Sequence, residues 1–192
     1  MNRILFAAAA VFFLLPGAAH AAPYLGLDLN ANLLNLNPAD PSAYPQTAIG
    51  PDFHVGYRFD NLNLAGELGY GSSRGQQDPD NFRMNLLTAD GLYYVPIGGF
   101  LNLILTAGVA DMNYGDSIAT FSVFQKNGVD KTVRTGNTVF QGDEIDWRAG
   151  GGLSFILTEG YEVHFITRYQ PVSMRGLADY SLSLDVGMNF YF

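Results

Sequence analysis

Two histidines and a set of carboxylates and arginines are the residues of this chain that could do chemistry. Histidine changes its charge near neutral pH, so His54 and His164 could transfer protons or gate a pore. Each histidine lies in a stretch where polar and apolar residues alternate, and each has the parity of its polar neighbours. Charged residues of both signs share this parity: Asp28, Arg58, Glu67, Asp90, Arg148, Glu162, Arg168 and Asp185. Because buried charges must be paired, the pattern predicts an internal network of salt bridges and hydrogen bonds.

Other kinds of site have less support. The histidines and acids lack a metal-ligand spacing, and Gly150-Gly151-Gly152 lacks the lysine and helix of a phosphate-binding loop, so we interpret these glycines as close packing or bending. The chain has no cysteine, which excludes thiolate chemistry. Its net charge of −8 argues against phosphate binding. We therefore predict no metal, no cofactor and no nucleic-acid partner.

The elements that position these residues begin after an export signal. Arg3 precedes an apolar run from Ile4 to Leu15, and Ala19-His20-Ala21 is typical of a cleavage site. The run is shorter than the about 20 residues that a membrane helix needs. We predict a signal peptide over residues 1–21, cleaved after Ala21, and one mature domain over residues 22–192.

Period-two alternation predicts eight strands in the mature chain. They span about residues 24–33, 52–59, 62–70, 84–95, 101–110, 146–157, 161–169 and 180–192. The last is the clearest, because apolar and small or polar residues alternate from Tyr180 to Phe192. No later window has the apolar length of a membrane helix, which excludes a helical membrane protein.

The connections between these strands alternate in length. The links at Asp60-Asn61, Pro96 to Gly99 and Thr158 to Gly160 are short, whereas those between them are longer. Outer-membrane barrels have short periplasmic turns and long extracellular loops. We expect the rim with the short turns and both chain ends to face the periplasm.

The composition of the two strand faces distinguishes a membrane barrel from a soluble one. A solvated face should carry lysines, yet both lysines, Lys126 and Lys131, lie in the third long loop. The apolar face has no ionisable side chain except tyrosine, which suits lipid, and its aromatic residues fall mainly near strand ends. We predict an all-β fold, an eight-stranded antiparallel up-and-down transmembrane β-barrel.

The closing segment adds a family resemblance. The export signal, the eight alternating strands and residues 182–192 (LSLDVGMNFYF) resemble the small outer-membrane barrels of the OmpA, OmpX and Opa-like type. This resemblance implies a bacterial outer-membrane protein surrounded by lipid. It also implies that the barrel-assembly machinery reads Met188, Phe190 and Phe192. OmpA has a peptidoglycan-binding domain after its barrel; here the chain stops at the eighth strand, so we do not expect that function.

Three functions are open to such a barrel. Some outer-membrane barrels are lipid-modifying hydrolases, but the His-x-Ser motif of lipid A deacylases is missing, because His164 is followed by Phe165 and Ile166. We therefore predict that the protein is not an enzyme. A small gated pore is an alternative, since eight strands close too tightly for an open channel. We favour a structural surface protein that contributes to adhesion or envelope integrity through its extracellular loops.

The third long loop, at about residues 112–144, is the longest. Residues 118–125 and 132–140 flank the turn dipeptide Asn127-Gly128, so we predict a hairpin that extends the fifth and sixth strands above the membrane. A ten-stranded barrel is the rival, but Lys131, Val133, Thr135 and Asn137 make no apolar face. The protruding edge could pair with a strand of an extracellular or host ligand.

Overall fold

A computed structural model describes residues 21–36, 47–76, 82–126, 129–172 and 178–192. For residues 116–126 and 129–141 it describes the backbone alone. The expected signal peptide falls outside these ranges except for Ala21, so it stays a prediction.

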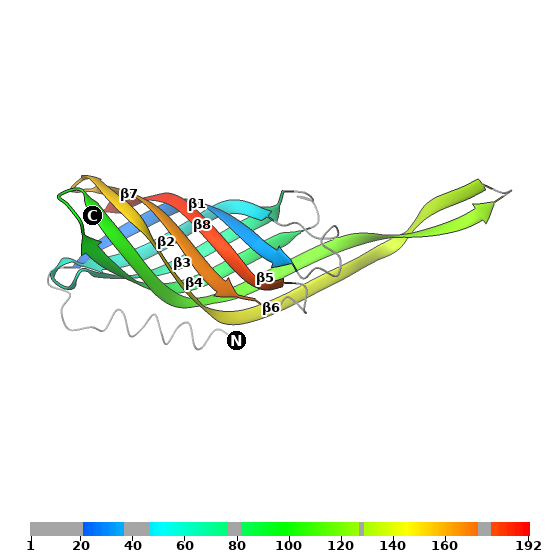
Figure 1. Ribbon diagram of the computed structural model, residues 1–192, viewed down its shortest axis with the longest axis horizontal. Helices are drawn as coiled ribbons and strands as arrows, with labels where there is room; N and C mark the ends of the chain where they lie inside the picture. The colour runs from blue at the N-terminus through cyan, green and yellow to red at the C-terminus, as the bar shows by residue number, and fades with distance from the viewer. Residues whose placement is uncertain (1–20, 37–46, 77–81, 127–128, 173–177) are drawn as a thin grey trace.

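Eight antiparallel strands form a closed barrel in which each strand pairs with its neighbours in the sequence (Figure 1). The strands are β1(Ala21–Leu36), β2(Thr47–Phe59), β3(Leu64–Gly75), β4(Arg83–Pro96), β5(Leu101–Lys126), β6(Val129–Thr158), β7(Tyr161–Pro171) and β8(Ala178–Tyr191). Pairing of β1 with β8 closes the wall, with Leu25 opposite Phe190 and Leu29 opposite Val186. The predicted fold class is confirmed. Closure satisfies the backbone groups of the first and last strands, which a lipid environment requires.

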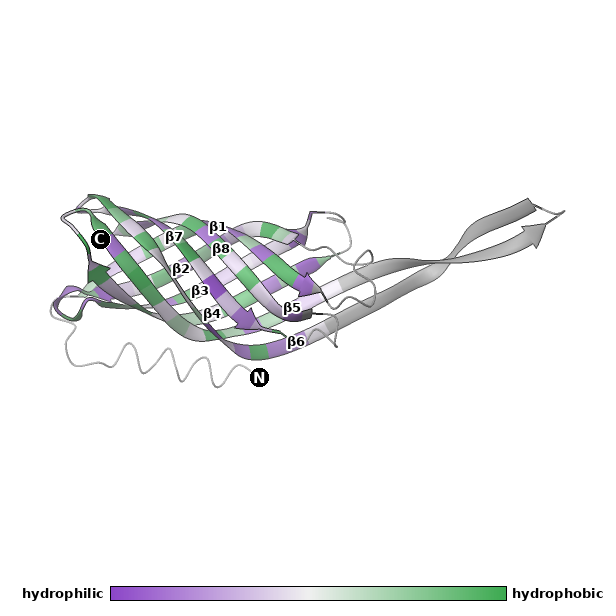
Figure 2. Ribbon diagram, in the orientation of Figure 1, coloured by the Kyte–Doolittle hydropathy of each residue, from purple (hydrophilic) through white to green (hydrophobic). Residues whose placement is uncertain are grey.

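The predicted parity of the strands is also confirmed, except at Phe59, which ends β2 and is buried although it has the parity of the outward residue Phe53. Leu27, Phe53 and Leu184 are each about half exposed, whereas their neighbours Asp28 and Asp185 are buried. The fourth strand follows the same rule, since Tyr93 is exposed and Tyr94 is fully buried. Apolar and polar residues consequently alternate along the wall (Figure 2). Among the described residues, no helix has the length and apolar character to cross a membrane.

Short turns join the strands at one rim, the rim that carries the C-terminus (Figure 1). Between β2 and β3 the chain forms a short 3-10 helix, η2(Asp60–Leu62). Asn63 then adopts a left-handed conformation (φ 53°), and its N–H donates to the Asp60 carbonyl at 3.2 Å. The turn therefore takes more residues than Asp60-Asn61, and β3 begins at Leu64 rather than at the predicted Leu62.

Strands β5 and β6 continue far beyond the rest of the wall. They pair with each other from Leu101 opposite Phe155 to Lys126 opposite Val129, whereas β4 reaches only Gly115 of β5 and β7 only Ala149 of β6. The outcome is a long hairpin that leaves the barrel at the rim opposite the short turns (Figure 1). The predicted extension is confirmed and the ten-stranded rival is wrong, because eight strands close the barrel. The turn residues Asn127-Gly128 lie outside the described residues.

The barrel interior contains two apolar clusters and a set of buried charged residues. An apolar cluster fills the end from which the hairpin extends; it comprises Leu34, Ala48, Phe82, Met84, Leu86, Ala110, Met112, Tyr114 and Val172. A second cluster fills the short-turn end and comprises Tyr24, Ala65, Leu92, Tyr94, Ile104 and Ile166. Buried charged residues of β1, β2, β3, β4, β6, β7 and β8 also face the interior, some of them in contact with the second cluster. We call these residues the charged layer.

Candidate functional site

The charged layer contains the residues that sequence parity placed inside the barrel. Nine of the ten side chains are buried: Asp28, His54, Glu67, Asp90, Arg148, Glu162, His164, Arg168 and Asp185. The tenth, Arg58, lies at the short-turn end with a side chain 14% exposed. Adjacent residues of a strand point to opposite faces, so each of these side chains is held inward by its outward apolar neighbours.

Arg168 of β7 connects three strands at the centre of the layer. Its guanidinium forms an ion pair with Asp185 on the adjacent strand β8. It also lies 3.0 Å from Glu67 of β3, and its Nε lies 3.9 Å from Asp90 of β4. The side chain is 5% exposed. One buried cation thereby satisfies carboxylates from both sides of the barrel.

Arg148 of β6 forms a two-pronged pair with Asp90 of β4. Its Nε donates to Asp90 Oδ1 at 2.8 Å, and its Nη2 donates to Asp90 Oδ2. This ion pair crosses β5 at Gly108, which has no side chain to block it. A Cβ at Gly108 would lie 2.2 Å from Asp90 Oδ1. Two parallel hydrogen bonds make this geometry the strongest kind of arginine–carboxylate contact.

Arg58 links the interior to the rim with the short turns. Its Nη1 donates to Glu162 at 2.8 Å, and its Nε lies 3.0 Å from Asp60 in the turn. The guanidinium also lies over the ring of Tyr94, 4.2 Å from the centroid, a cation–π contact. These contacts occupy the short-turn end of the lumen.

The two histidines meet around one carboxylate. His164 Nε2 lies 3.0 Å from Asp28 Oδ1, and His54 Nδ1 lies 3.6 Å from Asp28 Oδ2. The imidazole rings have centroids 5.8 Å apart. On its other side, His54 Nε2 lies 2.8 Å from Asn189 Oδ1. Sequence spacing gave no indication of this meeting, because the three residues come from β1, β2 and β7.

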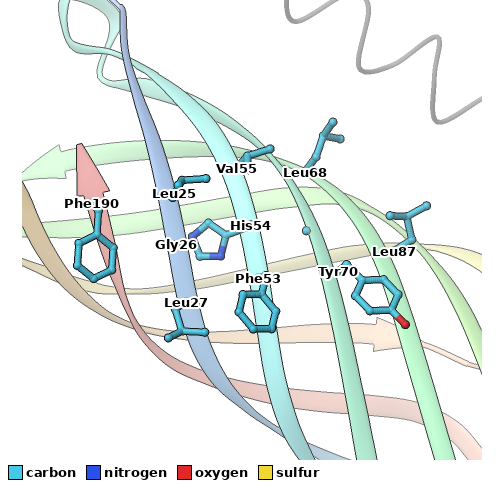
Figure 3. A pocket seen from close by; sticks show the side chains of 11 residues that line it. Leu25, Gly26, Leu27, Phe53, His54, Val55, Leu68, Tyr70, Leu87 and Phe190 are labelled. Atoms are coloured by element: carbon cyan, nitrogen blue, oxygen red, sulfur yellow. The ribbon is translucent and has the colours of Figure 1, made fainter. Parts of the chain in front are cut away.

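Glycines leave the space that these side chains occupy. A Cβ at Gly26 would lie 1.8 Å from His54 Nε2, and one at Gly187 would lie 1.8 Å from Asp28 Oδ1. Figure 3 shows the His54 ring beside Gly26, with Phe53 and Val55 of the same strand around an apolar groove on the outer wall. Successive residues of β2 therefore place apolar side chains on the outer face and a polar side chain on the inner face.

Several interior polar residues were absent from the predicted network. Asp52 is buried beside Gly69 and Gly71, and Asn30 and Asn32 are buried near Asp185, to which the Asn30 amide donates. Tyr24 donates to Glu67 at 3.1 Å. Each of these residues has the parity of the charged residues on its own strand, so the alternation alone could have identified them.

Aromatic residues and the expected assembly residues lie on the outer wall. Trp147, Tyr169 and Tyr180 form a row across β6, β7 and β8, with ring centroids 5.7 and 5.4 Å apart. Phe190 and Phe192 are exposed, and Met188 is partly exposed. Recognition of these last three residues by the assembly machinery stays a prediction.

Comparison with known proteins agrees with this architecture. The model of the family described as "Outer membrane protein beta-barrel domain" matches residues 4–190. No curated protein matches the chain. Among solved structures, Neisserial surface protein A superposes with a TM-score of 0.62 at 15% identity, covering 91% of this chain and 98% of that one.

Two further solved structures have the same fold. Ail, the attachment invasion locus protein of Yersinia pestis, has a TM-score of 0.53 at 11% identity, over 90% of this chain and 97% of Ail. The N-terminal β-barrel domain of OprF from Pseudomonas aeruginosa has a TM-score of 0.51 at 16% identity, over 87% and 97% of the two chains. At sequence identities this low, the similarity shows a shared fold and nothing about function.

Proposed function

Because this chain belongs to the outer-membrane β-barrel domain family and lies in the bacterial outer membrane, we propose that it is a surface protein whose β5–β6 hairpin makes contacts outside the cell. The single observation that carries this proposal is the length of the hairpin. Strands β5 and β6 remain paired up to Lys126 and Val129, whereas β4 pairs with β5 only as far as Gly115. A barrel wall alone does not need this extension.

The orientation follows from the two rims. Barrels of this kind place their short turns in the periplasm and their long loops outside. The short turns lie at the rim with Asp60 and Gly160, and the hairpin leaves the opposite rim. We therefore infer that the hairpin projects from the cell.

The hairpin also has sheet edges that could bind a partner. Beyond Gly115 and Ala149, the backbones of β5 and β6 pair only with each other in the described part of the chain. Unpaired N–H and C=O groups along an edge are a template for another strand, and such strand addition is a common mode of peptide recognition. A partner with an extended segment would fit this edge.

The fold neighbours support contact with a host as the class of function. Ail is an attachment invasion locus protein, and its structure has been solved in complex with the heparin analogue sucrose octasulfate, with a TM-score of 0.51 to this chain. That ligand is not transferred here, because an identity of 11% compares the folds alone. The ligand of the hairpin has to be identified by experiment.

A deletion tests the proposal. Removing residues 116–142 joins Gly115 to Asp143 and leaves Asn113 opposite Asp143, as they are now, across a two-residue turn. Bacteria that display this variant should lose binding to host cells or matrix proteins that bacteria with the full chain bind. Heat-modifiable gel mobility should show that the shortened barrel still folds.

Equal binding by the full chain and the folded deletion variant would contradict the proposal. A second control variant is Gly98→Ala in the turn between β4 and β5, at the opposite rim. A Cβ there meets nothing within 4 Å, so binding should be unchanged.

The pore and hydrolase alternatives have less support. The lumen is filled by the charged layer and by two apolar clusters. No observation on the described residues favours hydrolysis, and the predicted absence of enzymatic activity stays a prediction.

A further inference from the structure

Three metal-ligating side chains from three strands converge inside the barrel. Asp28 of β1, His54 of β2 and His164 of β7 are all buried, and one ligand atom from each lies within 4.8 Å of the other two. Two imidazoles and one carboxylate are a ligand set that transition-metal ions bind in proteins. This cluster is independent of the hairpin.

The distances suit a tetrahedral ion. With metal–ligand bonds of about 2.1 Å, two ligand atoms of a tetrahedral site lie about 3.4 Å apart. Asp28 Oδ1 lies 3.0 Å from His164 Nε2, and Asp28 Oδ2 lies 3.6 Å from His54 Nδ1, so each imidazole is close to this separation from one carboxylate oxygen. All three ligand atoms lie within 4.8 Å of one another, so the side chains would move closer together to bind one ion.

The hydrogen bonds of the cluster leave acceptors facing each other. His54 Nε2 contacts the side-chain oxygen of Asn189 at 2.8 Å, and an amide oxygen can only accept, so Nε2 carries the proton. In a neutral ring, Nδ1 then presents a lone pair to Asp28 Oδ2. Asp28 Oδ1 has no hydrogen-bond partner among the described residues, although His164 Nε2 is 3.0 Å away. A cation bound between Asp28 and the two imidazoles would accept the lone pairs of His54 Nδ1 and of the Asp28 carboxylate.

The charge of the interior also calls for a cation. Six interior carboxylates face three guanidinium groups in the described part of the chain, an excess of three acids. The acids are Asp28, Asp52, Glu67, Asp90, Glu162 and Asp185, and the bases are Arg58, Arg148 and Arg168. Uncompensated buried charge is unfavourable. A divalent ion would remove two of the three uncompensated charges.

The surroundings hold the ligands in place. Asn189 orients the His54 ring, as the outer partners of metal-bound histidines do. Gly26 and Gly187 make room for His54 and Asp28, and any side chain at either glycine would collide with them. The arrangement therefore depends on residues from β1, β2, β7 and β8 together.

We propose that Asp28, His54 and His164 form a binding site for a divalent transition-metal ion such as Zn²⁺. Each residue supplies one ligand atom, and a water molecule completes the tetrahedron. Mg²⁺ and Ca²⁺ prefer oxygen ligands and higher coordination, so they should bind this site poorly. The ion would tie together strands from both sides of the β1–β8 closure.

Metal titration of the whole chain tests this site. The protein is folded in detergent, stripped with a chelator and titrated with Zn²⁺ and, separately, Mg²⁺ by calorimetry. We expect one Zn²⁺ per chain and no Mg²⁺ binding. Asp28→Asn and His164→Gln should each lower the affinity for Zn²⁺ at least about tenfold. Asp143→Asn, which removes an exposed carboxylate at the base of the hairpin, should bind Zn²⁺ like the unmodified protein.

Two outcomes would overturn the proposal. The first is no Zn²⁺ uptake by the folded protein. The second is Zn²⁺ binding that the His54→Gln, His164→Gln double variant retains. If a variant does not fold, X-ray absorption of the Zn²⁺-loaded unmodified protein decides, because two imidazoles are expected at the ion and their absence contradicts the site.

Discussion

At the scale of single residues, the buried arginines of the charged layer are paired with carboxylates. Arg168 contacts Asp185 and Glu67, and Arg148 holds Asp90 with two hydrogen bonds, so each buried arginine has more than one acceptor atom. A buried pair adds little net stability over apolar residues, but removing one partner leaves an uncompensated charge in a low-dielectric interior. We propose that this layer holds strands β3, β4, β6, β7 and β8 in register.

Arg168→Met should destabilise the barrel by about 3 to 5 kcal/mol, because Asp185 and Glu67 would lose their cation. Reversible urea unfolding in lipid vesicles measures the change. The matched control is Arg74→Met, which removes an exposed arginine of β3 and should change stability by less than about 0.5 kcal/mol. An equal effect of both substitutions would show that Arg168 has no special role.

A second residue-scale prediction concerns the glycines of β6. A Cβ at Gly152 would lie 1.9 Å from the Phe165 carbonyl oxygen, a backbone atom that cannot move aside. Gly152→Ala should therefore cost about 1 to 3 kcal/mol of unfolding free energy by the same urea assay. Gly98→Ala in the turn, where a Cβ meets nothing within 4 Å, should be close to neutral. If Gly152→Ala is neutral too, the glycines do not serve close packing.

At the scale of the strand, the apolar side chains of the outer face are explained by the lipid that surrounds the barrel. Leu25, Leu29 and Phe165 are exposed in the isolated barrel, as are their counterparts on β8. Water would make such a surface unstable, whereas lipid accommodates it. Successive side chains of one strand face the lipid and the barrel interior in turn. A shift of one residue in register would exchange the two faces.

Val186 tests this assignment near the middle of the wall. It lies on β8 between Leu29 of β1 and Phe165 of β7. Val186→Arg should lower the unfolding free energy in lipid vesicles by about 2 to 4 kcal/mol, because an arginine there enters the hydrocarbon layer. Leu62→Arg, an exposed position in η2 at the rim, should cost about 1 kcal/mol at most. Equal costs at the two positions would place the hydrocarbon layer elsewhere.

At the scale of the whole molecule, a filled barrel carries a long hairpin at one rim. Two apolar clusters and the charged layer fill the lumen, and Arg58 and Glu162 of that layer lie at the short-turn end. In the orientation proposed above, the rim with the short turns faces the periplasm, and the hairpin would then have a rigid base in the membrane. Function is accordingly expected at the hairpin and not along a path through the lumen.

Conductance measures how well the lumen is closed. In planar bilayers we expect only small, brief openings, because eight strands leave space for side chains alone. Arg168→Met should increase the frequency of openings, since it disconnects β7 from Glu67 of β3 in the middle of the layer. Large, stable openings of the unmodified protein would contradict the filled interior and favour the pore.

Much of this architecture was predictable from the order of residues. Alternation identified eight strands, the parity of the fourth strand and the inward position of residues such as His54 and Arg168, because a strand exposes successive side chains to opposite sides. The extension of β5 and β6 also followed from the turn dipeptide and the pattern around it. These properties depend on neighbours along the chain.

Tertiary structure alone decided which interior residues meet. The approach of Asp28, His54 and His164 and the two contacts of Arg168 with Asp185 and Glu67 depend on the register between strands and on barrel closure. Parity says that a side chain points inward but not at what height or toward which partner. Gly26 and Gly187 make room for His54 and Asp28, and this role appears only when the facing strand is in place.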